Sequence, residues 1–212
     1  MRVTKYEHSC LDIELGGRRL LIDPGIVSSS IPNYENIEAV IITHVHADHF
    51  DPIKVQAIYA QNPSVVIYTV QDVSNELQET IPHHVVSGGM KVKAGSFQLE
   101  FFGGQHAVIH NSVPIIDNVG VMINNSLYYP GDSLTVPNTP INTLALPISA
   151  PWLKISEAMD FLTTLKPEQV FPVHDALLSD FGMQVNSTWL KIATDAIDTK
   201  YIVLSSGESI TI

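Results

Sequence analysis

Three histidines and one aspartate fall within six residues of this chain, directly after a short and continuous apolar run. The run spans residues 39–43, and its apolar character favours a strand that is buried on both faces. The motif that follows is His44-x-His46-x-Asp48-His49. On an extended segment, positions 44 and 46 project to the same side. The chain then turns toward a helix that residues 51–52, Asp-Pro, are suited to start.

Imidazole and carboxylate groups are good ligands for zinc and chemically similar ions. One tetrahedral ion takes four ligands, but it does not accept all four from a stretch of only six residues. The motif therefore predicts two adjacent metal ions, one bound by His44 and His46 and the other by Asp48 and His49. Metal binding is favoured over a structural role, because a solvated loop gives no reason for such a cluster.

Two metal ions need further ligands from distant parts of the chain. His106, Asp132 and His174 each come just after a predicted strand. Rigid sheets commonly present functional groups on loops at the ends of their strands. We therefore expect these three side chains to meet the motif in space.

The remaining pattern predicts inner sheets with helices outside them. Residues 11–15 alternate between apolar and acidic, as on a half-buried strand, and Gly16-Gly17 provides a tight turn to a partner strand at 20–22. No Pro-, Ser- or Gly-rich linker divides the chain, so residues 1–212 are expected to form one domain. Further strands are expected at 1–8, 65–69, near 85, and at 90–94, 97–102, 119–123, 127–129, 170–173, 201–204 and 210–212, with helices from 52, at 73–79, 155–165 and 185–196.

Composition limits the partners of the chain. Its 212 residues are 45% hydrophobic, which is enough for a sizeable core. Acidic residues outnumber basic ones by 22 to 11, and the net charge of −11 disfavours binding to nucleic acid or to anionic membranes. The single cysteine, Cys10, excludes an intrachain disulfide and is expected to be a small core residue. Without a signal peptide or a membrane-length apolar run, a cytoplasmic location is the default expectation.

Several other titratable residues have two open interpretations. Asp23 and Asp175 are candidates to accept the second ring N–H of a metal-bound histidine, although Asp23 could equally be a turn residue. His8 could line the site or be structural. His110 could bind substrate or donate a proton, or it could be an ordinary loop residue. A structural or surface role is favoured for His83 and His84.

The motif after an apolar strand, together with Gly104-x-His106, Gly131-Asp132 and a final His174, resembles the metallo-β-lactamase superfamily. The likeness covers nearly the whole chain. The segments 8–11, His-Ser-Cys-Leu, and 21–24, Leu-Ile-Asp-Pro, resemble the metal-dependent hydrolases related to L-ascorbate-6-phosphate lactonase. The resemblance implies an α/β chain folded as a four-layer αββα sandwich, with the metals at one edge between two sheets.

The resemblance also implies a ligand set and a reaction. One ion would be bound by His44, His46 and His106 and the second by Asp48, His49 and His174, while Asp132 and a hydroxide would bridge both. The two ions would be Zn²⁺, with Mn²⁺ as the alternative. The hydroxide would attack an ester, lactone or phosphoester, and Asp48 would orient it besides binding metal.

Charge and missing motifs narrow the substrate. In the implied site, two carboxylates and a hydroxide carry a total charge of −3, and the two divalent ions carry +4. The resulting net charge of +1 favours a small anionic substrate. No Gly-rich phosphate loop is present in the sequence. A redox di-iron relative usually has Glu where this chain has His46, and a non-catalytic relative would usually have lost ligands. Relatives often assemble, so a homo-oligomer is an alternative to a monomer.

Overall fold

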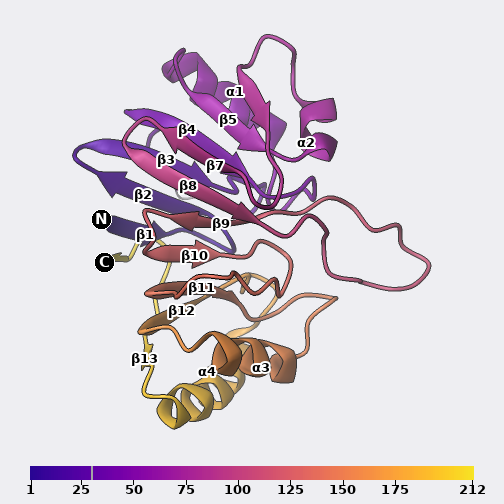
Figure 1. The fold of residues 1–212 in the computed structure, drawn as a ribbon, viewed down its shortest axis with the longest axis vertical. Coiled ribbons are helices and arrows are strands. Elements are labelled where there is room, and N and C mark those ends of the chain that lie inside the picture. Colours follow the sequence, from indigo (N-terminus) through magenta and orange to yellow (C-terminus); the bar gives the residue numbers. More distant parts are fainter. Residues whose placement is uncertain (30) are drawn as a thin grey trace.

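The computed structural model describes residues 1–29 and 31–212, and the strands of this described part form two seven-stranded mixed sheets. Figure 1 shows helices α1 (Pro52–Gln61) and α2 (Gln71–Glu76) beside the first sheet, and α3 (Ile155–Leu165) and α4 (Asp180–Ala196) beside the second. The sandwich of two sheets between outer helices confirms the predicted αββα fold.

The first sheet has the strand order β14-β1-β2-β3-β4-β5-β6, and the second has the order β13-β12-β11-β10-β9-β8-β7. The strands of the first are β1 (Arg2–Lys5), β2 (Leu11–Leu15), β3 (Arg18–Ile22), β4 (Ile37–Ile42), β5 (Val66–Thr69), β6 (His83–Val85) and β14 (Ser209–Thr211). Those of the second are β7 (Lys91–Ala94), β8 (Phe97–Phe102), β9 (Gly120–Ile123), β10 (Leu127–Tyr129), β11 (Thr143–Pro147), β12 (Gln169–Val173) and β13 (Lys200–Tyr201).

Two apolar clusters hold the layers together. The larger cluster contains residues of both sheets, such as Ile41 from β4 and Phe101 from β8, and therefore lies between them. The smaller cluster joins the second sheet to its helices, with Leu144 of β11 packed among Leu162 of α3 and Leu190 of α4. Burial of this apolar area is the main force that holds the sheets and helices in register.

The strand directions bring the site together at one edge. Strands β3, β4 and β5 are parallel neighbours, as are β10, β11 and β12, so the last residues of each set meet at a common edge. Two backbone hydrogen bonds join the sheets there: Val119 N–H donates to the Thr43 carbonyl at 3.1 Å, and His174 N–H donates to the His8 carbonyl at 3.0 Å.

Several local predictions are confirmed. Gly16 and Gly17 have φ values of 60° and 78°, as a tight turn with two left-handed residues requires. Helix α1 begins at Pro52, and the Asp51 carboxylate accepts hydrogen bonds from the N–H groups of Ile53 and Lys54. No helix within the described ranges is both long and apolar enough to span a bilayer. The cytoplasmic location stays a prediction.

Other local predictions need correction. Helix α4 begins at Asp180 and not at 185, because the Ser179 hydroxyl accepts from Gly182 N–H at 3.2 Å and caps a turn whose glycine weakens the sequence signal. Strand β11 was not predicted, because it lies among proline-rich segments and itself ends in Pro147. Strand β13 is shorter than expected and ends at Tyr201, whereas β14 has the expected three residues but lies one position earlier, at Ser209–Thr211.

Candidate metal centre

The structure brings all seven predicted ligands together in two groups at the common edge of the sheets. The first group contains His44 and His46 from the loop after β4, His106 from the loop after β8, and Asp132 from the loop after β10. The second contains Asp48, His49, His174 and, in addition, His8. Within each group the potential ligand atoms lie within 4.8 Å of one another.

Four buried imidazole rings have their Nδ1 atoms fixed by hydrogen bonds to neighbouring oxygens. The acceptors of His106 and His174 are the carbonyls of Ala107 and Ser149, both at 2.6 Å. A carbonyl only accepts, so these two Nδ1 atoms carry the ring proton and leave Nε2 with a free lone pair. The Nδ1 atom of His49 lies 2.7 Å from Asp23 Oδ2, and that of His44 lies 3.0 Å from Thr43 Oγ1.

The opposite nitrogens of these rings have no partner within the described chain. Five buried ligand atoms lack a hydrogen bond there: Nε2 of His44, His49, His106 and His174, and Oδ1 of Asp132. Each buried polar atom without a partner costs about 1–3 kcal/mol. Imidazole nitrogens, which bind metal when they carry no proton, and a carboxylate oxygen that converge in this way fit the donor set of Zn²⁺ and similar ions.

Asp132 lies between the two groups. Its carboxylate oxygens are 3.2 Å from Nε2 of His49 and 3.1 Å from Nε2 of His174, and 3.4 Å from Nε2 of His106 in the first group. Burial alone would raise the pKa of this carboxyl, but the surrounding histidines, His49 first among them, lower it well below its usual range. Asp132 is therefore an anion placed to contact an ion in either group.

Trp152 fixes that carboxylate from the outside. Its Nε1–H donates to Asp132 Oδ2 at 2.7 Å. Nothing local in the sequence connects positions 132 and 152, so this contact could not be predicted from the sequence.

Asp23 orients histidines of both groups. Its buried carboxylate accepts hydrogen bonds from the Tyr129 hydroxyl at 2.8 Å, from the Thr43 hydroxyl at 2.7 Å and from the Thr43 N–H at 2.8 Å. The Asp23 carboxylate also lies 2.7 Å from His49 Nδ1. The Thr43 hydroxyl that donates to it lies 3.0 Å from His44 Nδ1, so Thr43 links Asp23 to His44. Burial opposes protonation of His49, but the carboxylates of Asp132 and Asp23 outweigh it and raise the pKa of His49 to about 9.

Replacing this carboxylate is expected to disturb both groups. In Asp23→Asn, the amide N–H₂ faces donors that it cannot satisfy, so the free energy of unfolding should fall by about 1–3 kcal/mol. Zinc affinity should fall by about 10–100-fold, because outer contacts of this kind orient metal-bound histidines. Zinc titration and chemical denaturation measure the two effects. Tyr129→Phe removes one donor only and should change both quantities less, and unchanged zinc affinity in Asp23→Asn would contradict this role.

Two glycines allow the loops to approach closely enough to form the site. A Cβ on Gly25 would lie 1.9 Å from the Asp48 carbonyl oxygen, so only glycine fits against this part of the motif. Gly131 has a φ of 62°, and a Cβ there would lie 2.4 Å from Asn118 Oδ1. The same Asn118 oxygen accepts from Asp132 N–H at 3.0 Å and so sets the backbone of that ligand.

The other predicted residues lie outside both groups. His110 is exposed, and its Nδ1 lies 2.8 Å from the Ser112 hydroxyl, so its catalytic role stays a prediction. Asp175 pairs with Lys5 at 2.8 Å, and the acceptor at the His174 ring is the Ser149 carbonyl instead. His83 and His84 also lie apart from the ligands: His83 contacts Ser74 and the Ile81 carbonyl, and His84 stacks near Tyr68.

Cys10 is a core residue and not a nucleophile. Its side chain is buried, and burial raises the pKa of the thiol. We expect a thiol-specific aromatic disulfide to leave the native protein unlabelled and to label it once in denaturant, since the thiolate is the reactive form. Rapid labelling of the native protein with loss of activity would contradict this assignment.

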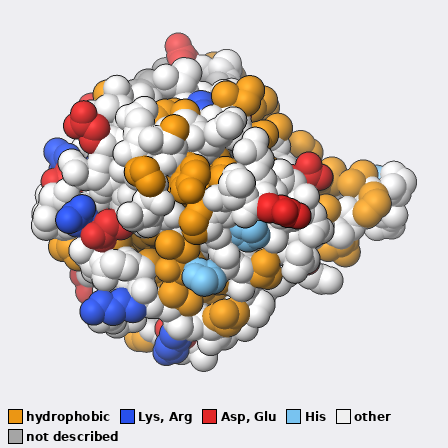
Figure 2. Space-filling model, turned by 90° about the horizontal axis from the view of Figure 1, so that it is seen from above, with side chains coloured by type: hydrophobic (Ala, Val, Ile, Leu, Met, Phe, Trp, Pro, Cys, Tyr) orange, Lys and Arg blue, Asp and Glu red, His pale blue; other side chains and the backbone are white. Residues whose placement is uncertain are grey.

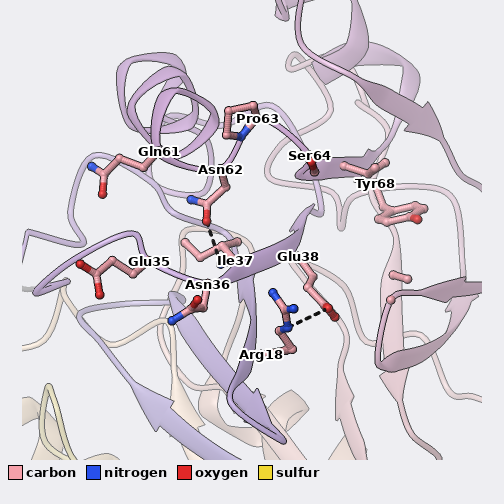
Figure 3. Close-up of a pocket in the computed structure, with 13 residues that line it drawn as sticks. Arg18, Glu35, Asn36, Ile37, Glu38, Gln61, Asn62, Pro63, Ser64 and Tyr68 are labelled. Atoms are coloured by element: carbon pink, nitrogen blue, oxygen red, sulfur yellow. Dashed lines mark hydrogen bonds and ion pairs between the residues drawn. The ribbon is translucent and has the colours of Figure 1, made fainter.

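The surface pocket in Figure 3 belongs to another part of the molecule. It is lined by the first residues of the parallel strands β3, β4 and β5, and Arg18 Nε lies 3.4 Å from Glu38 Oε1 in it. The metal groups follow the last residues of these strands, so the pocket lies at the opposite edge. It contains none of the clustered ligands.

The loop between β8 and β9 continues from His106 and projects from the body of the protein (Figure 1). Figure 2 shows the same projection, with apolar side chains on it. The exposed apolar residues of the loop are Val108, Val113 and Ile115. Exposed apolar side chains thus lie on the loop that follows the ligand candidate His106.

Comparison with known proteins agrees with this fold and site. Residues 2–174 match the family described as beta-lactamase superfamily domain. Protein Rv0786c of Mycobacterium tuberculosis is 33% identical over 216 residues, which cover 100% of both chains. Several archaeal relatives of 23–26% identity, matched over nearly their whole length, carry the name UPF0173 metal-dependent hydrolase.

Two solved structures share the fold. Igni18, a metallo hydrolase from the archaeon Ignicoccus hospitalis, has a TM-score of 0.77 at 18% identity and is matched over 97% of its length, with 100% of this chain. CmlA, a diiron β-hydroxylase from Streptomyces venezuelae, has a TM-score of 0.74 at 15% identity, and all of this chain matches 54% of it.

The chain belongs to the β-lactamase superfamily domain family. Within that superfamily it is a metal-dependent hydrolase.

Proposed function

We propose that the chain is a dinuclear hydrolase, in which two divalent ions act together on one substrate. The observation that carries this proposal is the position of Asp132 between two groups of histidines whose Nε2 atoms lack other partners. Two such groups at one edge, sharing a carboxylate, support two adjacent ions better than one. Zn²⁺ suits the nitrogen-rich donor set, and Mn²⁺ is the alternative.

Each residue then has a defined task. His44, His46 and His106 would bind the first ion, Asp48, His49 and His174 the second, and Asp132 both. Divalent ions in such a site supply Lewis acidity and lower the pKa of bound water toward neutrality. The chain itself contributes oriented imidazoles, through Asp23 and the backbone carbonyls, and a carboxylate held by Trp152.

The substrate we propose is a small anionic ester, lactone or phosphoester. The net positive charge of a loaded site favours an anion, whereas the acidic chain disfavours long nucleic acids. Segments 8–11 and 21–24, which resemble the hydrolases related to L-ascorbate-6-phosphate lactonase, are our reason to include a lactone in this class. The projecting loop with its exposed apolar side chains supports a substrate with an apolar part, and His110 on that loop is the residue we propose to contact it.

Metal analysis joined to an activity screen tests the proposal. The purified protein, loaded separately with Zn²⁺ and Mn²⁺, would be assayed against phosphodiesters, phosphomonoesters and lactones. Two zinc or manganese ions per chain with hydrolysis of one class is the expected result. Two tightly held iron ions with no hydrolysis would favour a redox protein, as the CmlA fold likeness suggests, and a chain without metal would favour a non-catalytic relative.

A further inference from the structure

His8 lies in the turn between β1 and β2, and its ring reaches the second ligand group. Its φ of 62° is left-handed, which is uncommon for a residue other than glycine. Two hydrogen bonds tie it to the loop after β12: its carbonyl accepts from His174 N–H at 3.0 Å, and its Nδ1 accepts from Ala176 N–H at 3.3 Å. An uncommon backbone conformation fixed by such contacts is typical of a functional position.

The contact with Ala176 determines which nitrogen of His8 carries the proton. A backbone N–H only donates, so Nδ1 must offer a lone pair, and the ring proton must be on Nε2. This arrangement is the reverse of that in His106 and His174, where Nδ1 donates to a carbonyl and Nε2 is free. A nitrogen that carries a proton cannot bind a metal ion. His8 is therefore near the second group without having the chemistry of a ligand.

The protonated nitrogen faces Asp48. His8 Nε2 lies 2.9 Å from Asp48 Oδ2, within hydrogen-bond distance. The nearest imidazole nitrogens of His174 and His49 are 3.6 and 3.8 Å from the same oxygen, which is too far for a hydrogen bond. The Asp48 side chain is 35% exposed, so little packing restrains it. Within the described part of the chain, the His8 N–H is the contact that fixes the orientation of this carboxylate.

We propose that His8 is a positioning residue, whose Nε2–H holds the Asp48 carboxylate in the orientation needed to bind the second metal ion. The inference rests on the proposed two-metal function, since it takes Asp48 as a ligand. Hydrogen bonds to metal-binding carboxylates typically affect metal affinity by about 10–100-fold.

Two conservative variants separate the roles of the two ring nitrogens. His8→Gln can offer an N–H near the position of Nε2, whereas His8→Asn reaches only the position of Nδ1 and leaves Asp48 without a donor. Asparagine adopts the left-handed backbone of position 8 more readily than most residues, so backbone strain does not explain a loss of affinity in His8→Asn. Chelator competition with Zn²⁺ should show the second ion bound about 10–100-fold more weakly by His8→Asn, with His8→Gln close to the original protein. Equal affinity in all three proteins would overturn the proposal.

Nitrogen-15 NMR of the histidine rings gives a readout that needs neither a variant nor a substrate. We expect the His8 ring to carry its proton on Nε2 without metal and to keep it there when Zn²⁺ is added, while Nε2 of His49 and His174 shifts as metal binds. Loss of the His8 Nε2 proton on zinc addition would show a ligand and would overturn the positioning role. Failure of every substrate in the activity screen would end the proposed hydrolysis and leave these zinc measurements unaffected.

Discussion

Replacing His46 by alanine should abolish hydrolysis and leave the fold intact. The residue belongs to the first group and is only half-buried, so its removal should change the free energy of unfolding by about 1 kcal/mol or less. Loss of a direct ligand should cost more than the about 10–100-fold typical of outer contacts, so kcat/KM should fall by well over 100-fold. Steady-state kinetics on metal-loaded protein and thermal unfolding without metal measure the two quantities.

A matched control is available for this variant. His84 is exposed and belongs to neither ligand group, so His84→Ala removes an imidazole from the surface only. We expect His84→Ala to keep full activity and stability. Full activity in His46→Ala would overturn the assignment of the first group, whatever substrate is used. Equal loss in both variants would point to general damage rather than to metal binding.

The sequence predicts the ligands well because their signals are local. The motif at 44–49 requires only a buried strand followed by a turn, and β4 supplies both. His106, Asp132 and His174 are predictable because strand ends at a common edge present side chains to one another. To predict that these side chains lie close together, the order of strands in the sheets is not needed. It is enough to expect that the strands pack in one sandwich.

The contacts that orient these ligands could not be predicted in the same way. The amide that sets the His8 tautomer lies 168 residues further along the chain, and Trp152 reaches Asp132 across 20 residues. Such pairs depend on how loops approach after the sheets form, and no periodic pattern announces them. Strand β11 was missed for a related reason: its burial comes from neighbours on both sides, while its own sequence runs into Pro147.

The expectation that residues 1–212 form one domain stays a prediction.

Replacing Asp132 by asparagine is expected to have the second large effect on metal binding, because its carboxylate lies beside histidines of both groups. In Asp132→Asn the shape is nearly unchanged, and the side-chain oxygen can still accept from Trp152 Nε1–H. The new amide N–H₂ takes the position of Oδ1 and faces Nε2 of His49. Loss of the carboxylate also removes the main charge that raises the pKa of His49, so this nitrogen can accept, and the metal-free protein should be about as stable as the original. The negative charge that two cations would share is lost, and affinity for both ions should fall together.

Zinc-dependent stability distinguishes this shared role from an ordinary ligand. An ion at 100 times its Kd stabilises the fold by about 2.7 kcal/mol, so a 100-fold loss of affinity removes most of that gain. Asp132→Asn should therefore lose nearly all zinc-induced increase in Tm, whereas His46→Ala should keep the part due to the second ion. Asp195→Asn, an exposed carboxylate on α4, is the control and should keep the full increase. If Asp132→Asn still bound one ion with unchanged affinity, Asp132 would serve one group only, and the two ions would not share a carboxylate.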